Sequence, residues 1–578
     1  MPSWKSKRSL AECYSLMATP RSPLETETAL VGGRVQKHAS RFAGREYLVF
    51  ENEGYTYRQA FDAASDVANT LSQEYHVRKG DRVAICMRNV PEFLIVFWAT
   101  ALLGAVPTLI NAWLADAALE HCFNISSPTI AFVDRERADR VEGLLTSFKQ
   151  TIPIIVVRGH EAQGQEWKGM APWSQVFDGT RMNAGFWEKE PNCSPDDDGA
   201  IFFTSGTTAM PKATLSSQRA FISNSYTVMF GVVLANLRRG GAMPSVDDTK
   251  PQQSFLVTAP LFHVQGLAAN MMLCTLSGSK VVLMRKWNVA QALELCLREN
   301  VTATSGVPTV ITDIMRSSIP RQIRFEAISV GSAPMPATLS AEFSKIFPNV
   351  PLYHAYGLTE TTGVVTAVCG EDLFERAPTI GVPTPICDIL IIDSETSRPV
   401  PSNHVGELWV RGPNVMKCYL GDPSATNKAI TSDGWFMTGD LAVQDDDGFV
   451  YIRDRAKDVI IRGGENIHST TIESALLANP QIQDAAAVGV PSARLGELPA
   501  AIISLSSTSL VPDVDLERTL LEDVRRRLAP HAVPVLLLIR DKPIDRSATG
   551  KVDKGPLRKI AAEEWERRQV QGREKARM

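Results

Sequence analysis

The sequence predicts an α/β protein of more than one domain, and three observations carry this prediction. The chain has 578 residues, which is more than one ordinary hydrophobic core accommodates. Hydrophobic residues make up 44% and charged residues 21% of it, as in soluble globular proteins. Short apolar runs alternate with amphipathic stretches, which is the pattern of strands and helices in layered structures with largely parallel sheets.

The first 300 residues contain several runs that we expect to be strands. Five of them read YLVF (47–50), RVAIC (82–86), TIAFV (129–133), PIIVV (153–157) and KVVLM (280–284). Over 288–299 apolar residues recur at helical spacing, which predicts a helix. The uncharged stretch 93–110 approaches the length of a membrane span, but Gly104 and Pro107 interrupt it. We therefore expect a buried helix ending near Leu103 and a short buried strand after Pro107, not a transmembrane helix.

The predicted secondary structure changes after about Gly406, from alternating strands and helices to short strands and turns. Three short strands with turns are expected in GELWVRG (406–412), GWFMTGD (434–440) and DDDGFVYI (445–452), which indicates a β-rich subdomain. A helix (470–478), two strands (485–490 and 500–505) and a second helix (516–528) then predict a small α+β domain. We place the domain boundary between 1–456 and 457–578.

Composition excludes several classes of function. A net charge of −4 argues against a nucleic-acid-binding protein, which would carry a basic excess. The nine cysteines are odd in number and none are spaced C-x-x-C, so neither a zinc site nor a disulfide framework is expected. A reducing intracellular compartment follows. The tripeptide Ala576-Arg577-Met578 is a loose variant of the Ser-Lys-Leu address, which predicts a peroxisomal import receptor as a partner and the peroxisome as location, otherwise the cytoplasm.

The segment TSGTTAMPKA (204–213) follows an apolar run and has the character of a phosphate-binding loop. It offers four hydroxyl groups, flexible backbone amides at Gly206 and the ammonium group of Lys212, all of which suit phosphate oxygens. A nucleotide loop of the Walker type is excluded, because Pro211 and Ala213 occupy two of its defining positions. The loop also lacks the G-x-G-x-x-G of a dinucleotide site.

This loop resembles the [ST]SG[ST]TGxPKG loop of the adenylate-forming superfamily, which includes acyl-CoA synthetases, luciferases and adenylation domains. Further blocks follow in the order of that family: PLFHVQGL (260–267), SVGSAP (329–334), YGLTE (356–360), GELWVRGP (406–413), GWFMTGD (434–440), DRAKDVIIRGGENIHSTTIE (454–473) and DRSATGKVDK (545–554). The resemblance covers almost the whole chain past about residue 40. GGENIH (463–468) favours the branch of the 4-coumarate, 4-chlorobenzoate and medium-chain acyl-CoA ligases.

The resemblance implies a fold and an activity. The fold would be a large N-terminal domain of layered α/β subdomains plus a distorted β-barrel, followed by a small mobile α+β C-terminal domain. The activity would be that of an AMP-forming acid–CoA ligase. ATP would activate a hydrophobic or aromatic carboxylic acid to an acyl-adenylate with loss of pyrophosphate, and the acyl group would pass to coenzyme A. ATP, Mg²⁺ and coenzyme A are the small molecules expected.

The resemblance also assigns roles to single residues. Four catalytic residues are expected: Lys551, Thr359, Glu360 and Lys212. ATP or AMP would contact Thr204, Ser205, Gly206, Thr207, Thr208, Lys212, Gly331, Ser332, Ala333, Pro334, Tyr356, Gly357, Thr359, Asp440, Arg455 and Lys551. Among these, Tyr356 would stack on adenine, Asp440 and Arg455 would bind the ribose, and Glu360 would hold Mg²⁺. His263 would line the acyl site, Gly463 and Gly464 the coenzyme A tunnel, and Lys457 would be the hinge.

Three positions depart from the family pattern of the phosphate loop. Ala209 and Ala213 stand where glycines are usual, and Gln218 where a histidine often follows. The alanines are tolerable only where the backbone has negative φ. Two alternative functions stay open: a stand-alone adenylating enzyme that loads a carrier protein or makes an amide, and a non-catalytic member that binds nucleotide or acyl ligand.

Overall fold

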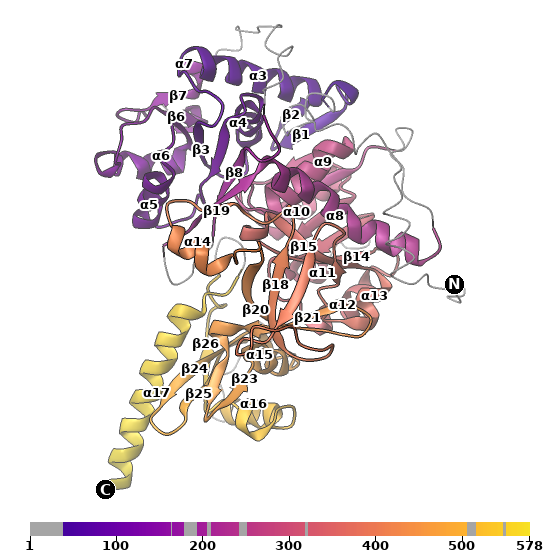
Figure 1. Cartoon of the computed structure of the whole chain (residues 1–578), viewed down its shortest axis with the longest axis vertical. Helices are drawn as coiled ribbons and strands as arrows, with labels where there is room; N and C mark the ends of the chain where they lie inside the picture. Colours follow the sequence, from indigo (N-terminus) through magenta and orange to yellow (C-terminus); the bar gives the residue numbers. More distant parts are fainter. Residues whose placement is uncertain are drawn as a thin grey trace.

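The structure is a computed structural model that describes residues 39–162, 165–177, 193–204, 210–241, 251–317, 322–505, 516–546 and 551–577. Figure 1 shows a large N-terminal part, coloured indigo to orange, and a small C-terminal part in orange and yellow beneath it. The long helix α17 (Lys554–Arg577) runs from the junction of the two parts to the C-terminus.

Two large, mainly parallel sheets form the core of the N-terminal part. The described strands of the first are, in spatial order, β16 (Val382–Pro383), β15 (Gly363–Cys369), β14 (Leu352–Leu358), β13 (Ala327–Val330), β12 (Ala303–Gly306), β10 (Ser254–Val257), β11 (Lys280–Leu283), β1 (Glu46–Phe50) and β2 (Glu53–Thr56). Those of the second are β19 (Cys418–Tyr419), β9 (Ala213–Ser217), β8 (Asp198–Phe203), β4 (Val106–Leu109), β3 (Arg82–Cys86), β5 (Ile130–Asp134), β6 (Ile154–Val157) and β7 (Ala171–Pro172). All five strands that the apolar runs predicted are present, as β1, β3, β5, β6 and β11.

Helices cover the two sheets and fill the space between them. In chain order they are α3 (Tyr57–Gln73), α4 (Pro91–Leu102), α5 (Asp116–Ser126), α6 (Arg135–Glu142), α7 (Trp173–Val176), α8 (Gln218–Arg238), α9 (Met272–Ser277), α10 (Val289–Arg298), α11 (Pro308–Arg316), α12 (Ala337–Ile346) and α13 (Glu371–Arg376). The helix predicted over 288–299 is α10, which begins where the Asn288 side chain accepts a hydrogen bond from the Gln291 amide at 3.0 Å.

The apolar stretch 93–110 folds as core. Helix α4 ends at Leu102, and β4 lies between β3 and β8 in the middle of the second sheet. The strand begins at Val106, one residue before Pro107. Within the described residues one helix, α8, is long and apolar enough to cross a membrane. It packs against β8 and β15, and over half of its most apolar window is buried, as in the core helix of a globular domain.

A third sheet follows the two large ones and is antiparallel. Its described strands are β17 (Asp388–Ile392), β18 (Gly406–Arg411), β20 (Phe436–Gln444) and β21 (Val450–Arg455). The three short strands expected after Gly406 are therefore present. The expected distorted barrel is an open four-stranded sheet in the described part of the chain, since β17 and β21 form its two edges.

The small C-terminal part is an α+β unit, as the sequence predicted. Its sheet contains β23 (Glu465–Ile467), β22 (Ile460–Arg462), β25 (Gly496–Leu505) and β24 (Ile482–Ser492), with β26 (Leu536–Arg540) paired to β25. The helices are α15 (Ser469–Leu477), α16 (Leu516–Arg525) and α17, and Leu476, Ile503 and Leu520 belong to a core of their own. The short turn η7 (Ala456–Asp458) joins this unit to β21.

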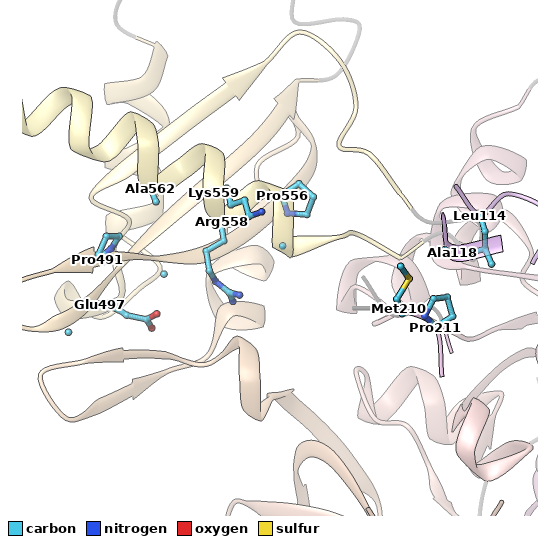
Figure 2. Close-up of a pocket in the computed structure, with 13 residues that line it drawn as sticks. Leu114, Ala118, Met210, Pro211, Pro491, Glu497, Pro556, Arg558, Lys559 and Ala562 are labelled. Carbon is cyan, nitrogen blue, oxygen red and sulfur yellow. The ribbon is translucent and has the colours of Figure 1, made fainter. Parts of the chain in front are cut away.

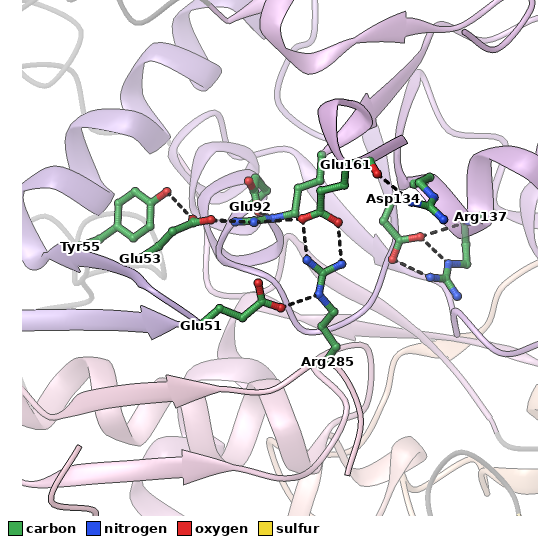
Figure 3. Close-up of polar contacts among 10 residues, drawn as sticks. Glu51, Glu53, Tyr55, Glu92, Asp134, Arg137, Glu161 and Arg285 are labelled. Atoms are coloured by element: carbon green, nitrogen blue, oxygen red, sulfur yellow. Dashed lines mark hydrogen bonds and ion pairs between the residues drawn. The ribbon is translucent and has the colours of Figure 1, made fainter. Parts of the chain in front are cut away.

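A network of charges around the buried Arg158 connects the two large sheets. The Arg158 side chain, only 4% exposed, donates to Glu53 on β2 at 2.8 Å and to Glu92 on α4 at 2.9 Å. Glu161 accepts from Arg158 at 3.4 Å and from Arg285. Figure 3 shows Glu51 and Glu161 both facing Arg285. Arg285 follows β11 of the first sheet, whereas Arg158 and Glu161 follow β6 of the second. The network therefore fixes the two sheets against each other at a distance from the motifs identified above.

Candidate active site

The two arms of the expected phosphate loop are held together by backbone pairing. The Thr204 amide donates to the Lys212 carbonyl at 2.9 Å, and the Lys212 amide donates to the Thr204 hydroxyl at 3.1 Å. The tip of the loop, 205–209, lies outside the described residues, and with it Ala209. Ala213 begins β9 and pairs with Phe203, so its backbone is extended and accommodates a methyl group. The loop therefore begins and ends in a regular antiparallel pair.

Gln218, the third departure from the family pattern, begins α8. Its side chain is buried, and its amide nitrogen donates to the Asp198 carbonyl at 3.2 Å. This contact joins the start of α8 to the start of β8, the strand that leads into the phosphate loop. Gln218 therefore has a local structural role beneath the loop.

A second group of expected residues meets where β14 approaches the antiparallel sheet. The Tyr356 hydroxyl on β14 donates to Asp440 Oδ2 at 2.5 Å, and Arg455 Nε donates to Asp440 Oδ1 at 2.8 Å. Asp440 on β20 is buried and Arg455 on β21 is its cross-strand neighbour. Burial, and next the Asp440 charge, raise the pKa of Tyr356 well above its ordinary value, so the phenol stays protonated. Asp440 thus has both of its oxygens oriented by residues expected at the same nucleotide.

Glycine is required at Gly357, the residue after Tyr356. A Cβ atom there would lie 1.8 Å from the Gly363 carbonyl oxygen on β15. The β14–β15 ladder shifts register at this point, between Tyr356 and Gly357. The irregularity redirects the chain into the short turn η6 (Thr359–Thr361), which carries two more of the expected residues.

The loop after β13 contains the residues expected along the adenine edge, Gly331 to Pro334. Ser332 has φ +62°, in the left-handed region, and its hydroxyl donates to Gln265 Oε1 at 2.8 Å. Gln265 opens η5 (Gln265–Met271), a π-helix that begins two residues after His263. π-Helices are rare and are frequent at functional sites. The bond therefore links the segment expected at adenine to the segment expected at the acyl group.

Glu360 lies in η6 and contacts β19. Tyr419 on β19 donates its hydroxyl to Glu360 Oε1 at 2.8 Å. The Lys212 ammonium lies 4.5 Å from the centroid of the Tyr419 ring, in a cation–π contact. Lys212 and Tyr419 also line a cleft of about 610 Å³ together with Thr438, Gly439 and residues of α14 (Pro423–Ala429). The cation Lys212 therefore borders a cleft whose wall includes Tyr419, the hydrogen-bond partner of Glu360.

Lys551 of the small C-terminal part lies within electrostatic reach of this group. Desolvation of its side chain, and then the Arg455 charge, lower the pKa of Lys551 below the ordinary lysine value, while Asp440 and Glu360 act in the opposite direction. The same ammonium acts on His263: burial first and Lys551 second lower the pKa of His263 to about 3. His263 is therefore neutral at physiological pH. The structure thus gathers Lys551, Glu360, Asp440, Arg455 and His263, which the sequence separates by up to 288 positions.

An open cleft of about 960 Å³ separates the small part from the large one beside this site. Figure 2 shows Pro556, Arg558, Lys559 and Ala562 of α17 on one side, with Leu114, Ala118, Met210 and Pro211 on the other. Met210 and Pro211 belong to the returning arm of the phosphate loop. The cleft therefore gives solvent access to that loop between the two parts.

The two glycines expected for coenzyme A lie elsewhere, whereas the charge of Lys457, the expected hinge residue, acts on Lys551. Gly463 and Gly464, with φ of +60° and +90°, form the tight turn between β22 and β23. Figure 1 shows β23 in the sheet of the small part, away from β19. Lys457 lies in η7, at the single-turn connection between β21 and β22. The structure therefore does not bring the glycine turn together with Lys551 and Glu360.

Two contact residues of the site were not predicted from the sequence. Tyr419 lies in the unremarkable segment KCYLGD (417–422), and Gln265 was seen only as part of the acyl-site block. Both act through side-chain bonds to residues 59 and 67 positions away, respectively. A single sequence contains no signal for such pairs.

The charges of the site suit a metal that is bound mainly by its substrate. Within the described ranges no group of three or more His, Cys, Asp or Glu side chains could hold a metal ion. Mg²⁺ in phosphate-transferring enzymes is held by one or two carboxylates plus phosphate oxygens and water. One oriented carboxylate, Glu360, beside a cleft bordered by Lys212 fits that mode of binding.

Residues 35–420 match the family model of the AMP-binding enzymes, and residues 471–551 match that of the AMP-binding enzyme C-terminal domain. The chain is 30% identical to 2-succinylbenzoate–CoA ligase of Bacillus velezensis, over 89% of this chain and 94% of that protein. It is 26% identical to peroxisomal OPC-8:0-CoA ligase 1 of Arabidopsis thaliana, over 91% of this chain and 92% of that protein.

Solved structures give the same result. The o-succinylbenzoate CoA synthetase of Bacillus subtilis, in complex with its acyl-adenylate intermediate, is 26% identical and has a TM-score of 0.74, over 91% of this chain and 97% of that one. The same synthetase in complex with ATP and a magnesium ion is also 26% identical, with a TM-score of 0.72. A match to the family model over more than half of the chain identifies the family. The chain belongs to the AMP-binding enzyme family.

Proposed function

We propose that this protein is an ATP-dependent acid–CoA ligase of the AMP-forming type. It converts a hydrophobic or aromatic carboxylic acid to acyl-AMP with release of pyrophosphate, and then transfers the acyl group to coenzyme A. The relatives named above are CoA ligases, and one was solved with its acyl-adenylate. We also propose that residues 1–456 form the domain that binds ATP and acid, and residues 457–578 a domain that rotates.

One observation carries the proposal: the ammonium of Lys551, from the small domain, lies within the charge group of the large one. Its pKa responds to Arg455, Asp440 and Glu360, and it acts in turn on His263. These neighbours are the residues expected at the ribose, the metal and the acyl group. A cation at this point would touch the carboxylate and the α-phosphate at once, which is where the reaction develops charge.

In the first half-reaction a carboxylate oxygen attacks the α-phosphorus of ATP. The new bond joins that oxygen to phosphorus, and the bond to the pyrophosphate oxygen breaks with its electron pair. Lys551 would bring the two anions together, Thr359 would donate to the α-phosphate, and Lys212 would neutralise the departing pyrophosphate. A lysine whose ammonium form is disfavoured before ATP binds gains most from the negative charge of the transition state.

The nucleotide would be held by the remaining residues of the group. Asp440 has both oxygens aligned by Tyr356 and Arg455, so it is pre-oriented to accept from ribose hydroxyls. Glu360 would hold Mg²⁺, which when bound neutralises charge on the phosphate chain. Thr204 would contribute from the described arm of the phosphate loop. The other loop residues, Ser205, Gly206, Thr207 and Thr208, lie outside the described residues and stay predictions.

The second half-reaction requires a different arrangement of the domains. The thiolate of coenzyme A attacks the acyl carbonyl carbon, and the carbon–oxygen bond to AMP breaks. We propose that the small domain turns about Lys457, which removes Lys551 and brings Gly463 and Gly464 to the site. The two glycines lack side chains and form a tight turn, which suits close approach of a pantetheine chain.

The apolar surroundings of His263 support a hydrophobic or aromatic acid. His263 is buried and neutral, and it follows Leu261 and Phe262, which are buried as well. The Phe262 ring packs edge-on against Trp113 with 5.4 Å between centroids. A wall of this kind attracts an apolar acyl group and leaves its carboxylate to Lys551.

The test is AMP formation from ATP and Mg²⁺ with a panel of short-, medium-, long-chain and aryl acids, each with and without coenzyme A. We expect AMP with one class of acid, and a rise in AMP on addition of coenzyme A. Pyrophosphate exchange that coenzyme A does not stimulate would instead indicate loading of a carrier protein. ATP binding without AMP formation from any acid would indicate a non-catalytic member.

The peroxisomal location stays a prediction. The relative from Arabidopsis thaliana is peroxisomal by name, and the tripeptide Ala576-Arg577-Met578 resembles a peroxisomal address. Fluorescent fusions that keep or lack the last three residues would test it, because only the complete form should co-localise with a peroxisomal marker.

A further inference from the structure

The segment around β19 physically connects the two halves of the phosphate site. At one end the Leu420 amide donates to the Ala213 carbonyl, next to Lys212, at 2.8 Å. At the other end the Met416 amide donates to the Glu360 carbonyl, also at 2.8 Å. Five residues of backbone therefore fix the spacing between the returning arm of the phosphate loop and the carboxylate expected to hold Mg²⁺.

The side chain of Tyr419, in the middle of this segment, makes the same connection. Its hydroxyl donates to Glu360 Oε1 at 2.8 Å, and its ring lies 4.5 Å below the Lys212 ammonium. The side chain is buried, and its backbone is held by pairing with Thr214 on β9. Tyr419 therefore stands between a cation and an anion that would otherwise attract each other directly.

A direct Lys212–Glu360 ion pair would engage the two groups that the phosphates and the metal need. With Tyr419 between them, Oε1 of Glu360 accepts from a neutral donor, and Oε2 is the atom that we expect to bind the metal. The ring attracts the ammonium without neutralising it. Partners of this kind, which orient a metal ligand without touching the metal, commonly change metal affinity by about 10- to 100-fold.

We propose that Tyr419 is a positioning residue for the ATP–magnesium complex, which aligns Glu360 through its hydroxyl and Lys212 through its ring. The inference rests on the proposed function only in assuming that ATP and Mg²⁺ bind here. The bond from the hydroxyl to Glu360 and the contact of the ring with Lys212 can be tested separately. Tyr419→Phe would keep the ring and lose the hydroxyl.

The test is calorimetric titration of ATP into the full chain at a series of Mg²⁺ concentrations and in EDTA, which requires no acid. For Tyr419→Phe we expect the Mg²⁺ concentration for half-maximal enhancement of ATP binding to rise roughly tenfold. The affinity for ATP in EDTA should change less than about twofold, because the contact between ring and Lys212 remains. For Tyr419→Leu we expect the same Mg²⁺ shift and a further loss of about threefold in EDTA.

Tyr55→Phe is the matched control, since it removes a similar hydroxyl–carboxylate bond, to Glu53 at 3.2 Å, on β2 of another sheet. It should leave both quantities unchanged. Wild-type Mg²⁺ dependence in Tyr419→Phe would overturn the inference. So would an equal loss of affinity with Mg²⁺ and in EDTA, since a general distortion of the site has that effect. A wild-type chain that bound no ATP would overturn both proposals.

The two proposals fail in different ways. If ATP and Mg²⁺ bind with the expected pattern but no acid yields AMP, the ligase function is wrong and the role of Tyr419 stands. If AMP forms and Tyr419→Phe binds Mg²⁺ as the wild type does, the ligase function stands and the role of Tyr419 is wrong.

Discussion

Two groups of charges in this protein, one around Arg158 and one around Lys551, differ in how the folded state affects their central cation. In the network between the sheets, Arg158 donates to three carboxylates and lies over the Phe50 ring at 4.8 Å. Burial alone would lower the pKa of Arg158, but the bonds with Glu53 and Glu92 raise it above the ordinary arginine value. The folded state therefore favours the charge that it encloses.

At the candidate active site the folded state has the opposite effect on the central cation. Desolvation and the neighbouring Arg455 lower the pKa of Lys551, so the folded state disfavours the charge that it places there. The carboxylates nearby are oriented by other partners, Asp440 by Tyr356 and Glu360 by Tyr419. The difference teaches that folding stabilises the charge of Arg158 in the first group and destabilises the charge of Lys551 in the second. Mutations should therefore separate stability from activity.

The largest expected effect is on stability, at Arg158. Arg158→Met would remove the common partner of Glu53, which is half-exposed, and of Glu92, which is largely enclosed. Breaking a buried pair such as Arg158–Glu92 typically costs about 3–5 kcal/mol in the free energy of unfolding. Urea denaturation would measure this loss, and ATP affinity of the folded fraction should be unchanged. Arg58→Met is the control, since it removes an exposed pair with Asp62 and should cost under about 0.5 kcal/mol. Equal costs at the two positions would contradict the comparison.

The next effect is on activity, at Lys551. Lys551→Ala should lower acid-dependent pyrophosphate exchange by about 10²- to 10³-fold, as for other preorganised charge donors. Thioester formation from supplied acyl-AMP should stay within a few-fold, because the proposed rotation removes Lys551 from the site. The melting temperature should not fall, since folding disfavours this ammonium. Lys559→Ala, at an exposed position on α17, is the control; equal loss of both half-reactions in Lys551→Ala would contradict domain rotation.

The sequence alone predicts features that depend on neighbouring positions better than contacts between residues that are far apart in the chain. Local patterns were sufficient for α10 and for the break between α4 and β4, whereas the motif blocks that contain Lys212, Glu360 and Lys551 were located by family resemblance, and the roles of these residues stay predictions. Hydrophobic period and turn residues act over a few positions, and a motif carries its own register.

The pairs between distant residues were not predictable in the same way. Arg158 finds Glu53 and Glu92 at separations of 105 and 66 residues. Tyr419 finds Glu360 at a separation of 59 residues, from a segment without a distinctive composition. Such contacts depend on strand order and register, which one sequence does not specify. The barrel expected from resemblance is likewise an open sheet in the described residues, because its closure depends on edge pairing.

A third effect concerns pH. His263 has a folded-state pKa of about 3 against a usual value of 6.5, so between these values the unfolded chain binds a proton that the folded chain does not. Stability from this group is complete above pH 6.5 and falls as pH decreases toward 3, by up to about 1.4 kcal/mol per pH unit. Urea denaturation at several pH values should show a shallower acid slope in His263→Gln. An unchanged slope would contradict the burial of a neutral His263.

The smallest effect concerns the connection between the domains. Asp454, just before η7, is buried; its Oδ2 accepts from the Ser469 amide at 2.5 Å and its Oδ1 from the Ser469 hydroxyl at 3.0 Å. Ser469 begins α15, beyond the proposed hinge at Lys457, and its hydroxyl accepts from Lys554 at 2.6 Å. The two bonds from Asp454 cross the hinge and hold the small domain in the arrangement that brings Lys551 to the site. Rotation about Lys457 would have to break them.

Asp454→Gly should therefore shift the domains away from this arrangement. The substitution removes two bonds to Ser469, each contributing on the order of 1 kcal/mol, so the equilibrium between the two arrangements should shift by roughly 30-fold and pyrophosphate exchange should fall by up to that factor. Thioester formation from supplied acyl-AMP should be equal or faster, because the rotated arrangement becomes easier to reach. Ser469→Ala, which keeps the amide bond and loses the hydroxyl, should give a smaller shift in the same direction. Parallel losses in both half-reactions would mean that Asp454 supports folding and does not bias the hinge.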